Sequence, residues 1–151
     1  MSTQNIMPAL ISEIETILNA AVKNDGNKAI KEIFKYPATT IEKYPAAIFY
    51  PSEFENGFET NEENMKTYGF RLFLVIAASR KNLSDIFDNI MPETVDAVLQ
   101  SLDDNWSLSN INGHRVWLKV DTGAWTVSDE QGSIEVTAEI NLSIKTLTSN
   151  N

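Results

Sequence analysis

Acidic side chains and one histidine are the residues of this chain that could carry out acid–base chemistry. The 151 residues include 21 Asp and Glu, one histidine and no cysteine, so a histidine-based triad must use His114, and thiolate chemistry is excluded. No Gly-x-Ser-x-Gly sequence marks a serine nucleophile. A lone histidine beside Arg115, directly after a turn, is typical of a surface residue, and carboxylate pairs among Glu135, Glu139 and Asp121 are expected by chance in so acidic a chain. The sequence therefore contains no recognisable catalytic site.

Cofactor and metal sites lack support as well. The six glycines are isolated, so the sequence has neither a dinucleotide fingerprint nor a phosphate-binding loop. Zinc would need His or Cys ligands, which leaves calcium or magnesium. The acidic stretch between Pro51 and Met65 does not have the spacing of a calcium-binding loop, and we interpret it as a solvated hairpin loop. We expect no metal and no cofactor. The glutamates of this stretch are Glu53, Glu55, Glu59, Glu62 and Glu63.

Charge is distributed unevenly along the chain. Residues 1–45 hold five bases and five acids, whereas residues 46–151 hold seven bases and sixteen acids, which gives the net charge of -9. Binding to nucleic acid depends on Lys and Arg that displace counterions from phosphates, and we interpret the lysines at 23, 28, 31 and 35 as a solvated face. A protein that grips DNA is therefore not expected, although an acidic wall would let DNA slide past.

Size and hydrophobicity favour one domain that spans residues 1–151. A hydrophobic content of 42% is enough for a core without disulfides or metals. The first ten residues lack the pattern of a signal peptide, and the longest apolar run, residues 72–78, is too short to cross a bilayer. We expect a soluble protein with no membrane partner.

Residues 133–147 form the clearest element, a strand with one apolar and one polar face. Side chains alternate between the two faces of an extended chain, so this pattern predicts an antiparallel sheet that is covered on one side. The apolar face comprises Ile134, Val136, Ala138, Ile140, Leu142 and Ile144, and the polar face includes Glu135 and Glu139.

The remaining periodicity predicts a helix, strands, a helical segment and further strands. An amphipathic helix is expected, with Pro8 in its first turn, with its periodic residues from Leu10 to Lys23 and with a stop at residues 24–27. Strands are expected at 46–50, 66–78 and 116–120, and residues 29–36 fit a short strand or a loop. The helical pattern at 83–102 contains Pro92, which either kinks one helix or starts a second one. Turns are expected at residues 112–113, at 122–123 and from 128 to 132, and the tryptophans near these turns are expected to be half-buried.

Together these elements predict an α+β domain. Its central sheet should be mostly antiparallel, with the N-terminal amphipathic helix and the second helical segment packed on it. The strand at 66–78 has apolar residues on both faces for part of its length, which places it in the centre of the sheet.

Four segments in this order resemble the tail terminator, or tail completion, proteins of long-tailed bacteriophages. They are the amphipathic N-terminal helix, the strand opened by residues 44–48 (YPAAI), the acidic stretch that leads to residues 68–76 (YGFRLFLVI), and the closing strand at residues 135–144 (EVTAEINLSI). The resemblance covers roughly residues 6–147. Pro92 departs from the uninterrupted helix of the family.

This resemblance implies a structural virion protein with no catalysis and no cofactor. Members form a hexameric ring on the last ring of the tail tube, end its polymerisation and provide the surface to which the filled head docks. The implied partners are further copies of the chain, the tail-tube protein and a head-completion or neck protein, with DNA only as cargo in the lumen. The implied location is the tail–neck junction of the virion, and the host cytoplasm during assembly.

The charge asymmetry adds a hypothesis about this ring. Acidic walls repel phosphate, so part of the glutamate set should line the lumen or a ring interface: Glu53, Glu55, Glu59, Glu62, Glu63, Glu135 and Glu139. Three alternatives remain open, namely another connector or neck ring protein, a tail-tube subunit, and a small ligand-binding domain or enzyme.

Overall fold

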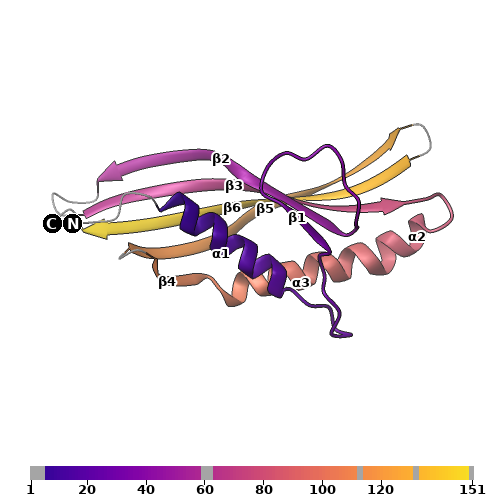
Figure 1. The fold of residues 1–151 in the computed structure, drawn as a ribbon, viewed down its shortest axis with the longest axis horizontal. Helices are drawn as coiled ribbons and strands as arrows, with labels where there is room; N and C mark the ends of the chain where they lie inside the picture. The colour runs from indigo at the N-terminus through magenta and orange to yellow at the C-terminus, as the bar shows by residue number, and fades with distance from the viewer. Residues whose placement is uncertain (1–5, 59–62, 112–113, 131–132, 150–151) are drawn as a thin grey trace.

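The computed structural model describes residues 6–58, 63–111, 114–130 and 133–149 as a long, twisted sheet with its helices on one face (Figure 1). Strand order is β1-β2-β3-β6-β5-β4, and each neighbouring pair is antiparallel except β1 and β2. The architecture is therefore mixed α+β. The elements are α1 Met7–Ala20, β1 Glu32–Phe34, β2 Ala46–Phe58, β3 Glu63–Ala78, α2 Leu83–Asp85, the π-helical turn η1 Ile86–Ile90, α3 Met91–Asp104, β4 Ser107–Ile111, β5 His114–Glu130 and β6 Ser133–Ser149.

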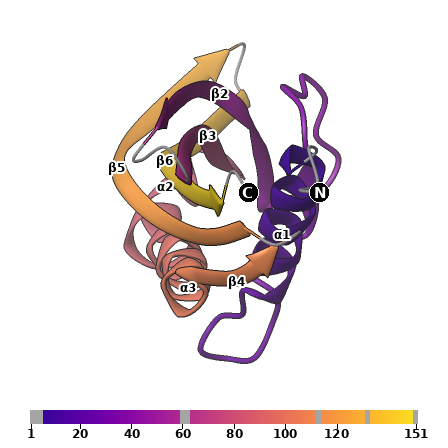
Figure 2. The ribbon, with the colours of Figure 1, turned by 90° about the vertical axis from the view of Figure 1, so that its left-hand side faces the viewer.

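Strand β6 lies at the centre of the fold, between β3 and β5. The predicted apolar face of this strand is confirmed, since its six side chains from Ile134 to Ile144 are each at most 5% exposed. Strand β3 is also central, as predicted, and it contributes Phe70, Leu72 and Leu74 to the same core. Seen end-on, the sheet curls into a half-barrel (Figure 2). The core fills the side on which the helices pack.

Helices α1 and α3 cover the core face with the apolar stripes that the sequence predicted. Four side chains of α1 are buried, and Pro8 lies in its first turn, where no intrahelical backbone donor is needed. In α3, Val98 and Leu102 are fully buried. The Ser101 hydroxyl donates a 2.8 Å hydrogen bond to the carbonyl oxygen of Ile17, which joins the two helices.

Pro92 neither breaks nor ends the second helical segment. Helical backbone continues from Leu83 to Asp104, with a π-helical turn immediately before α3. A proline has no N–H to donate, and its ring clashes with the preceding turn. The wider π-helical turn accommodates both effects, so Pro92 lies in the first turn of α3 within one helical run.

Two predicted strand boundaries were wrong. We expected Pro51 to end a strand and the acidic stretch to be a loop, but β2 continues to Phe58 and β3 begins at Glu63. The register shifts between Pro51 and Glu53. Because β1 pairs with only Ala46–Ile48 among the described residues, this part of β2 is an edge strand, where the missing donor of a proline is tolerated at a bulge.

The expected turn at Thr122-Gly123 is likewise a bulge inside β5, where the register shifts between Val120 and Gly123. The strand continues to Glu130. Of the turn expected from 128 to 132, residues 128–130 belong instead to β5. Residues 131–132, and the expected turn at residues 112–113, lie outside the described residues. The pairing of Ile111 with His114 leaves two residues between β4 and β5. The ambiguous segment at 29–36 contains β1, which is a strand parallel to β2.

Gly123 allows β5 and β6 to approach closely at this bulge, and its substitution tests the role of the bulge. A Cβ atom at this position would lie 2.9 Å from the backbone oxygen of Glu139. Gly123→Ala should therefore lower the free energy of unfolding by about 1–3 kcal/mol, measured by urea denaturation. In the control Gly57→Ala, the nearest backbone oxygen, that of Met65, would be 3.9 Å from the new Cβ. An equal loss of stability in both variants would contradict this account.

Candidate functional site

The sheet face opposite the helices, called here the outer face, carries two of the predicted glutamates. Glu135 and Glu139 project from β6 onto this face, where both are partly exposed. They alternate with buried residues, as the sequence predicted. They are four residues apart on the same face of one strand, which places them roughly 13 Å from each other.

Glu139 lies beside a cation rather than in a uniformly acidic wall. The Nε atom of Arg71 is 3.8 Å from its Oε1 atom, and both side chains are partly exposed. Such exposed pairs contribute about 0–1 kcal/mol. Next to this pair, Tyr50 and Phe73 stack with ring centroids 5.9 Å apart. The outer face is therefore mixed in character, with aromatic, cationic and acidic side chains.

Glu135 is held by the segment that joins β1 to β2. The hydroxyl of Tyr44 in this segment donates a 3.0 Å hydrogen bond to the Oε2 atom of Glu135. Partial burial of the ring, together with this bond and the nearby negative charge, raises the pKa of Tyr44. Glu135 thus anchors a loop to the sheet, a contact that sequence reasoning did not find because the two residues are 91 positions apart.

Glu53 and Glu55 also lie on the outer face, but on β2 and toward the other end of the sheet. Both are exposed, and they pair in register with Gly69 and Thr67 of β3. The side chain of Glu53 lies over Gly69, because a Cβ atom there would be 2.6 Å from its Cγ. Glu59 and Glu62 lie outside the described residues, and of Glu63 only the backbone, at the start of β3, is described.

Both edges of the sheet leave long stretches without a neighbour among the described residues. Strand β1 covers β2 only at residues 46–48, and β4 covers β5 only near residues 114–118. Beyond these points, at 49–58 of β2 and 119–130 of β5, no second strand among the described residues is paired with the outward side. Unprotected edges of this length are templates for pairing with a second chain.

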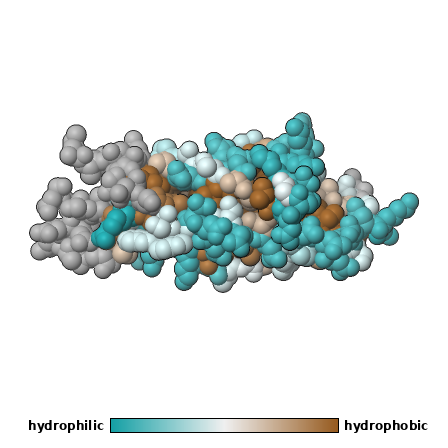
Figure 3. Space-filling view, turned by 90° about the horizontal axis from the view of Figure 1, so that it is seen from below, coloured by the Kyte–Doolittle hydropathy of each residue, from teal (hydrophilic) through white to brown (hydrophobic). Residues whose placement is uncertain are grey.

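Several large apolar side chains are exposed near these edges. Of the three tryptophans expected to be half-buried, Trp117 is partly buried, as expected, whereas Trp106 and Trp125 are 58% and 55% exposed. Phe54 is 80% exposed. Trp125 lies on the core face of β5 beyond the reach of β4, because it pairs with the buried Ala138. Seen from the side of α3 and β4, apolar patches interrupt a polar surface (Figure 3). Trp125 and Val127, which is 49% exposed, lie two residues apart on the same face of β5 and form a small apolar patch of the kind that marks interaction sites.

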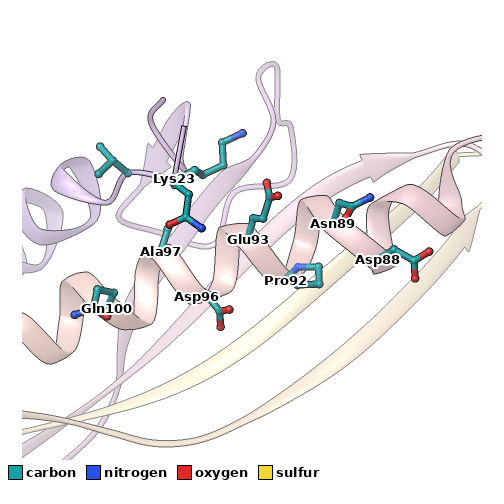
Figure 4. A pocket seen from close by; sticks show the side chains of 10 residues that line it. Lys23, Asp88, Asn89, Pro92, Glu93, Asp96, Ala97 and Gln100 are labelled. Atoms are coloured by element: carbon teal, nitrogen blue, oxygen red, sulfur yellow. The ribbon is translucent and has the colours of Figure 1, made fainter. Parts of the chain in front are cut away.

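A shallow groove of about 310 Å³ separates α3 from the chain that follows α1. From α3 and the π-helical turn, Glu93, Asp96 and Asp88 line the groove, and Lys23 lies on the opposite wall (Figure 4). Among the residues that the structure describes, His, Cys, Asp and Glu form no group of three or more arranged to hold a metal ion.

His114 is buried, at 7% exposed, which corrects the expectation of a surface residue. It lies on the same face of β5 as Val116, whose side chain is in the core.

Within the described part of the chain, no helix is both long and apolar enough for a membrane span. Compared with models of protein families and with curated proteins, the sequence matches none.

The bond between Tyr44 and Glu135 gives a stability prediction. Tyr44→Phe removes the donor, so it should lower the free energy of unfolding at neutral pH by about 0.5–1.5 kcal/mol. Urea denaturation followed by tryptophan fluorescence measures this value. Tyr50→Phe, which keeps the ring that stacks on Phe73, serves as the control and should be nearly neutral.

The same bond predicts a dependence on alkaline pH. A raised pKa means that the folded protein holds the phenolic proton more tightly than the unfolded chain. The contribution of Tyr44 is therefore complete below the ordinary value of 10.0 and is lost as pH rises through the folded-state pKa. As pH rises above about 10, wild type should therefore lose more stability than Tyr44→Phe. Parallel losses in the two proteins would contradict the assignment.

Proposed function

We propose that this chain is a structural virion protein of a long-tailed bacteriophage, similar to the tail terminator proteins. It forms a ring, hexameric in its expected form, that caps the tail tube, ends its polymerisation and provides the surface for joining the head. The observation that carries the proposal is the pair of uncovered sheet edges, at 49–58 of β2 and 119–130 of β5. A subunit with unpaired strands on two opposite sides is suited to neighbours on both sides.

The geometry of these edges favours a closed assembly over a two-fold dimer. The two edges are different surfaces at opposite sides of one sheet, so a contact between them is heterologous. Repeating a heterologous contact gives a ring when the rotation closes and a filament when it does not. The exposed Trp125 and Val127 beside the β5 edge supply apolar surface that such a contact would bury.

The acidic surplus supports a role around a DNA conduit. With a net charge of -9, a ring of this chain repels phosphate and lets duplex DNA pass without sticking. We assign part of the set comprising Glu53, Glu55, Glu59, Glu62, Glu63, Glu135 and Glu139 to the lumen or to a ring interface. Glu53 and Glu55 are the most suitable of the described members, because Glu135 and Glu139 already contact Tyr44 and Arg71.

Imaging of the purified protein tests the assembly. Negative-stain electron microscopy over a series of protein and salt concentrations, together with mass measurement of the same samples, should show six-fold rings with an opening wide enough for duplex DNA. Stacked rings that grow into filaments would instead identify a tail-tube subunit. Rings that bind the head connector but not the tail tube would identify another neck protein.

Charge neutralisation tests the acidic lining. Glu53→Gln with Glu55→Gln should leave folding intact, because both side chains are exposed, and should impair ring assembly or head joining. Glu13→Gln with Glu42→Gln removes the same charge from exposed positions outside the proposed set. Unchanged assembly and head joining in the first variant would count against the lumen or interface role.

A further inference from the structure

A groove of about 740 Å³ lies beside the end of β3 and the beginning of the second helical segment. Three lysines, Lys23, Lys28 and Lys31, line one side of this groove, and its apolar lining comes from Ile76, Ile86 and Ile90. We call it the lysine groove. Three of the twelve bases of an acidic chain therefore meet at one concave surface, although sequence reasoning interpreted them as a solvated face.

The lysines project from a turn whose backbone is tied down by hydrogen bonds. Val22 and Lys28 form an antiparallel bridge, and the Lys23 amide donates a 2.9 Å bond to the carbonyl oxygen of Asn27. Gly26 takes a positive φ of 86° within the turn, which a residue with a side chain rarely adopts. Farther along, the Lys31 amide donates a 2.8 Å bond to the carbonyl oxygen of Pro45. The backbone that carries these lysines is thus fixed by hydrogen bonds rather than being a loose loop.

Much of this positive charge is not neutralised inside the subunit. Lys23 lies 3.9 Å from Asp25, but Lys28 and Lys31 are exposed and make no ion pair with any residue that the structure describes. An acidic ligand would complement these lysines, whereas Ile76 and Ile86 are only 3% and 2% exposed and offer it little apolar surface. Charge complementarity of this kind gives orientation and specificity to a contact.

The chain itself carries a matching surface, the β2–β3 arm, formed by residues 52–57 paired with residues 65–69. Glu53 and Glu55 are exposed on one face of this arm and, like the lysines, form no ion pair with the described residues. Phe54 between them pairs with Tyr68, so it projects from the opposite face of the strand, where it is 80% exposed. The two unpaired carboxylates therefore carry the charge that complements the lysine groove.

One subunit cannot place its own arm in its own groove. Phe54 pairs with Tyr68 near the start of β3, whereas Ile76 of the groove lies eight residues farther along the same strand. At about 3.3 Å per residue, the two sites are roughly 25 Å apart on a rigid strand. Any contact between them must therefore join two copies.

We propose that the lysine groove of one subunit binds the acidic β2–β3 arm of the next copy. Lys28 and Lys31 pair with Glu53 and Glu55. The contact is heterologous, so it propagates around a ring. Its place in the tail-capping ring rests on the proposed function, whereas the contact between copies can be tested alone.

Two neutralising variants test the contact. Lys28→Ala with Lys31→Ala removes the groove charges, and Glu53→Gln with Glu55→Gln removes the arm charges. All four residues are exposed, so the variants should fold, which circular dichroism and urea denaturation confirm. Each variant should self-associate at least tenfold more weakly than wild type in sedimentation velocity. Lys35→Ala with Lys43→Ala and Glu13→Gln with Glu42→Gln are the matched controls.

Mixing the two variants gives the sharper result. The glutamine variant keeps an intact groove, and the alanine variant keeps an intact arm, so these two surfaces can still bind each other. The remaining groove and arm of such a pair are both neutralised. An equimolar mixture should therefore form one-to-one heterodimers that grow no further. Wild-type association should also weaken as salt rises, because exposed charges are screened. Variants that assemble like wild type, or a mixture without heterodimers, would overturn the contact.

The outcomes separate this contact from the proposed function. Wild-type protein that stays monomeric at all concentrations overturns the contact between copies, whereas ring formation on purified tail tubes still decides the function. Heterodimers in a protein that never caps tubes would support the contact and reject the function. If Lys28→Ala with Lys31→Ala abolishes binding to tail tubes but leaves self-association unchanged, the groove serves a different acidic partner, and the contact is overturned.

Discussion

The alternation of side chains along β6 is the constraint on which the rest of the structure depends. Its apolar face is buried from Ile134 to Ile144. The two neighbouring strands, β3 and β5, must align with β6 to bury their own apolar faces. A slip of one residue would turn this entire face to water. The long pairing with β3, which is uninterrupted, and with β5, which is interrupted by the bulge between Val120 and Gly123, therefore sets the register of the whole sheet. The helices cover the surface that this register creates.

The central strands are longer than the elements that flank them, and this mismatch shapes the surface. Strands β5 and β6 have 17 residues each, but β1 has three and β4 has five. The flanking strands therefore leave most of each edge open, and α1 and α3 leave Phe54 and Trp125 exposed. Isolated proteins usually protect such edges. The proposed ring explains why this chain leaves them free.

In this fold, the position of each charged side chain, rather than the net charge of the chain, decides which contacts that side chain makes. The same acidic chain places Glu135 and Glu139 in contact with Tyr44 and Arg71, leaves Glu53 and Glu55 exposed on an edge strand, and gathers three lysines at a groove. Net charge governs long-range repulsion of DNA. Recognition of a partner at short range depends instead on where the fold places the exposed glutamates and the lysines.

The sequence by itself determined the α+β class, the two amphipathic helical segments and the buried face of β6, because periodicity is a local property that burial imposes on every strand and helix. It misplaced the strand boundaries at Pro51 and Gly123, since bulges and edge positions depend on which neighbour is present. Only the tertiary structure decided that His114 is buried, that Tyr44 contacts Glu135 and that the lysines share a groove. These contacts join distant segments, and no local pattern encodes their meeting.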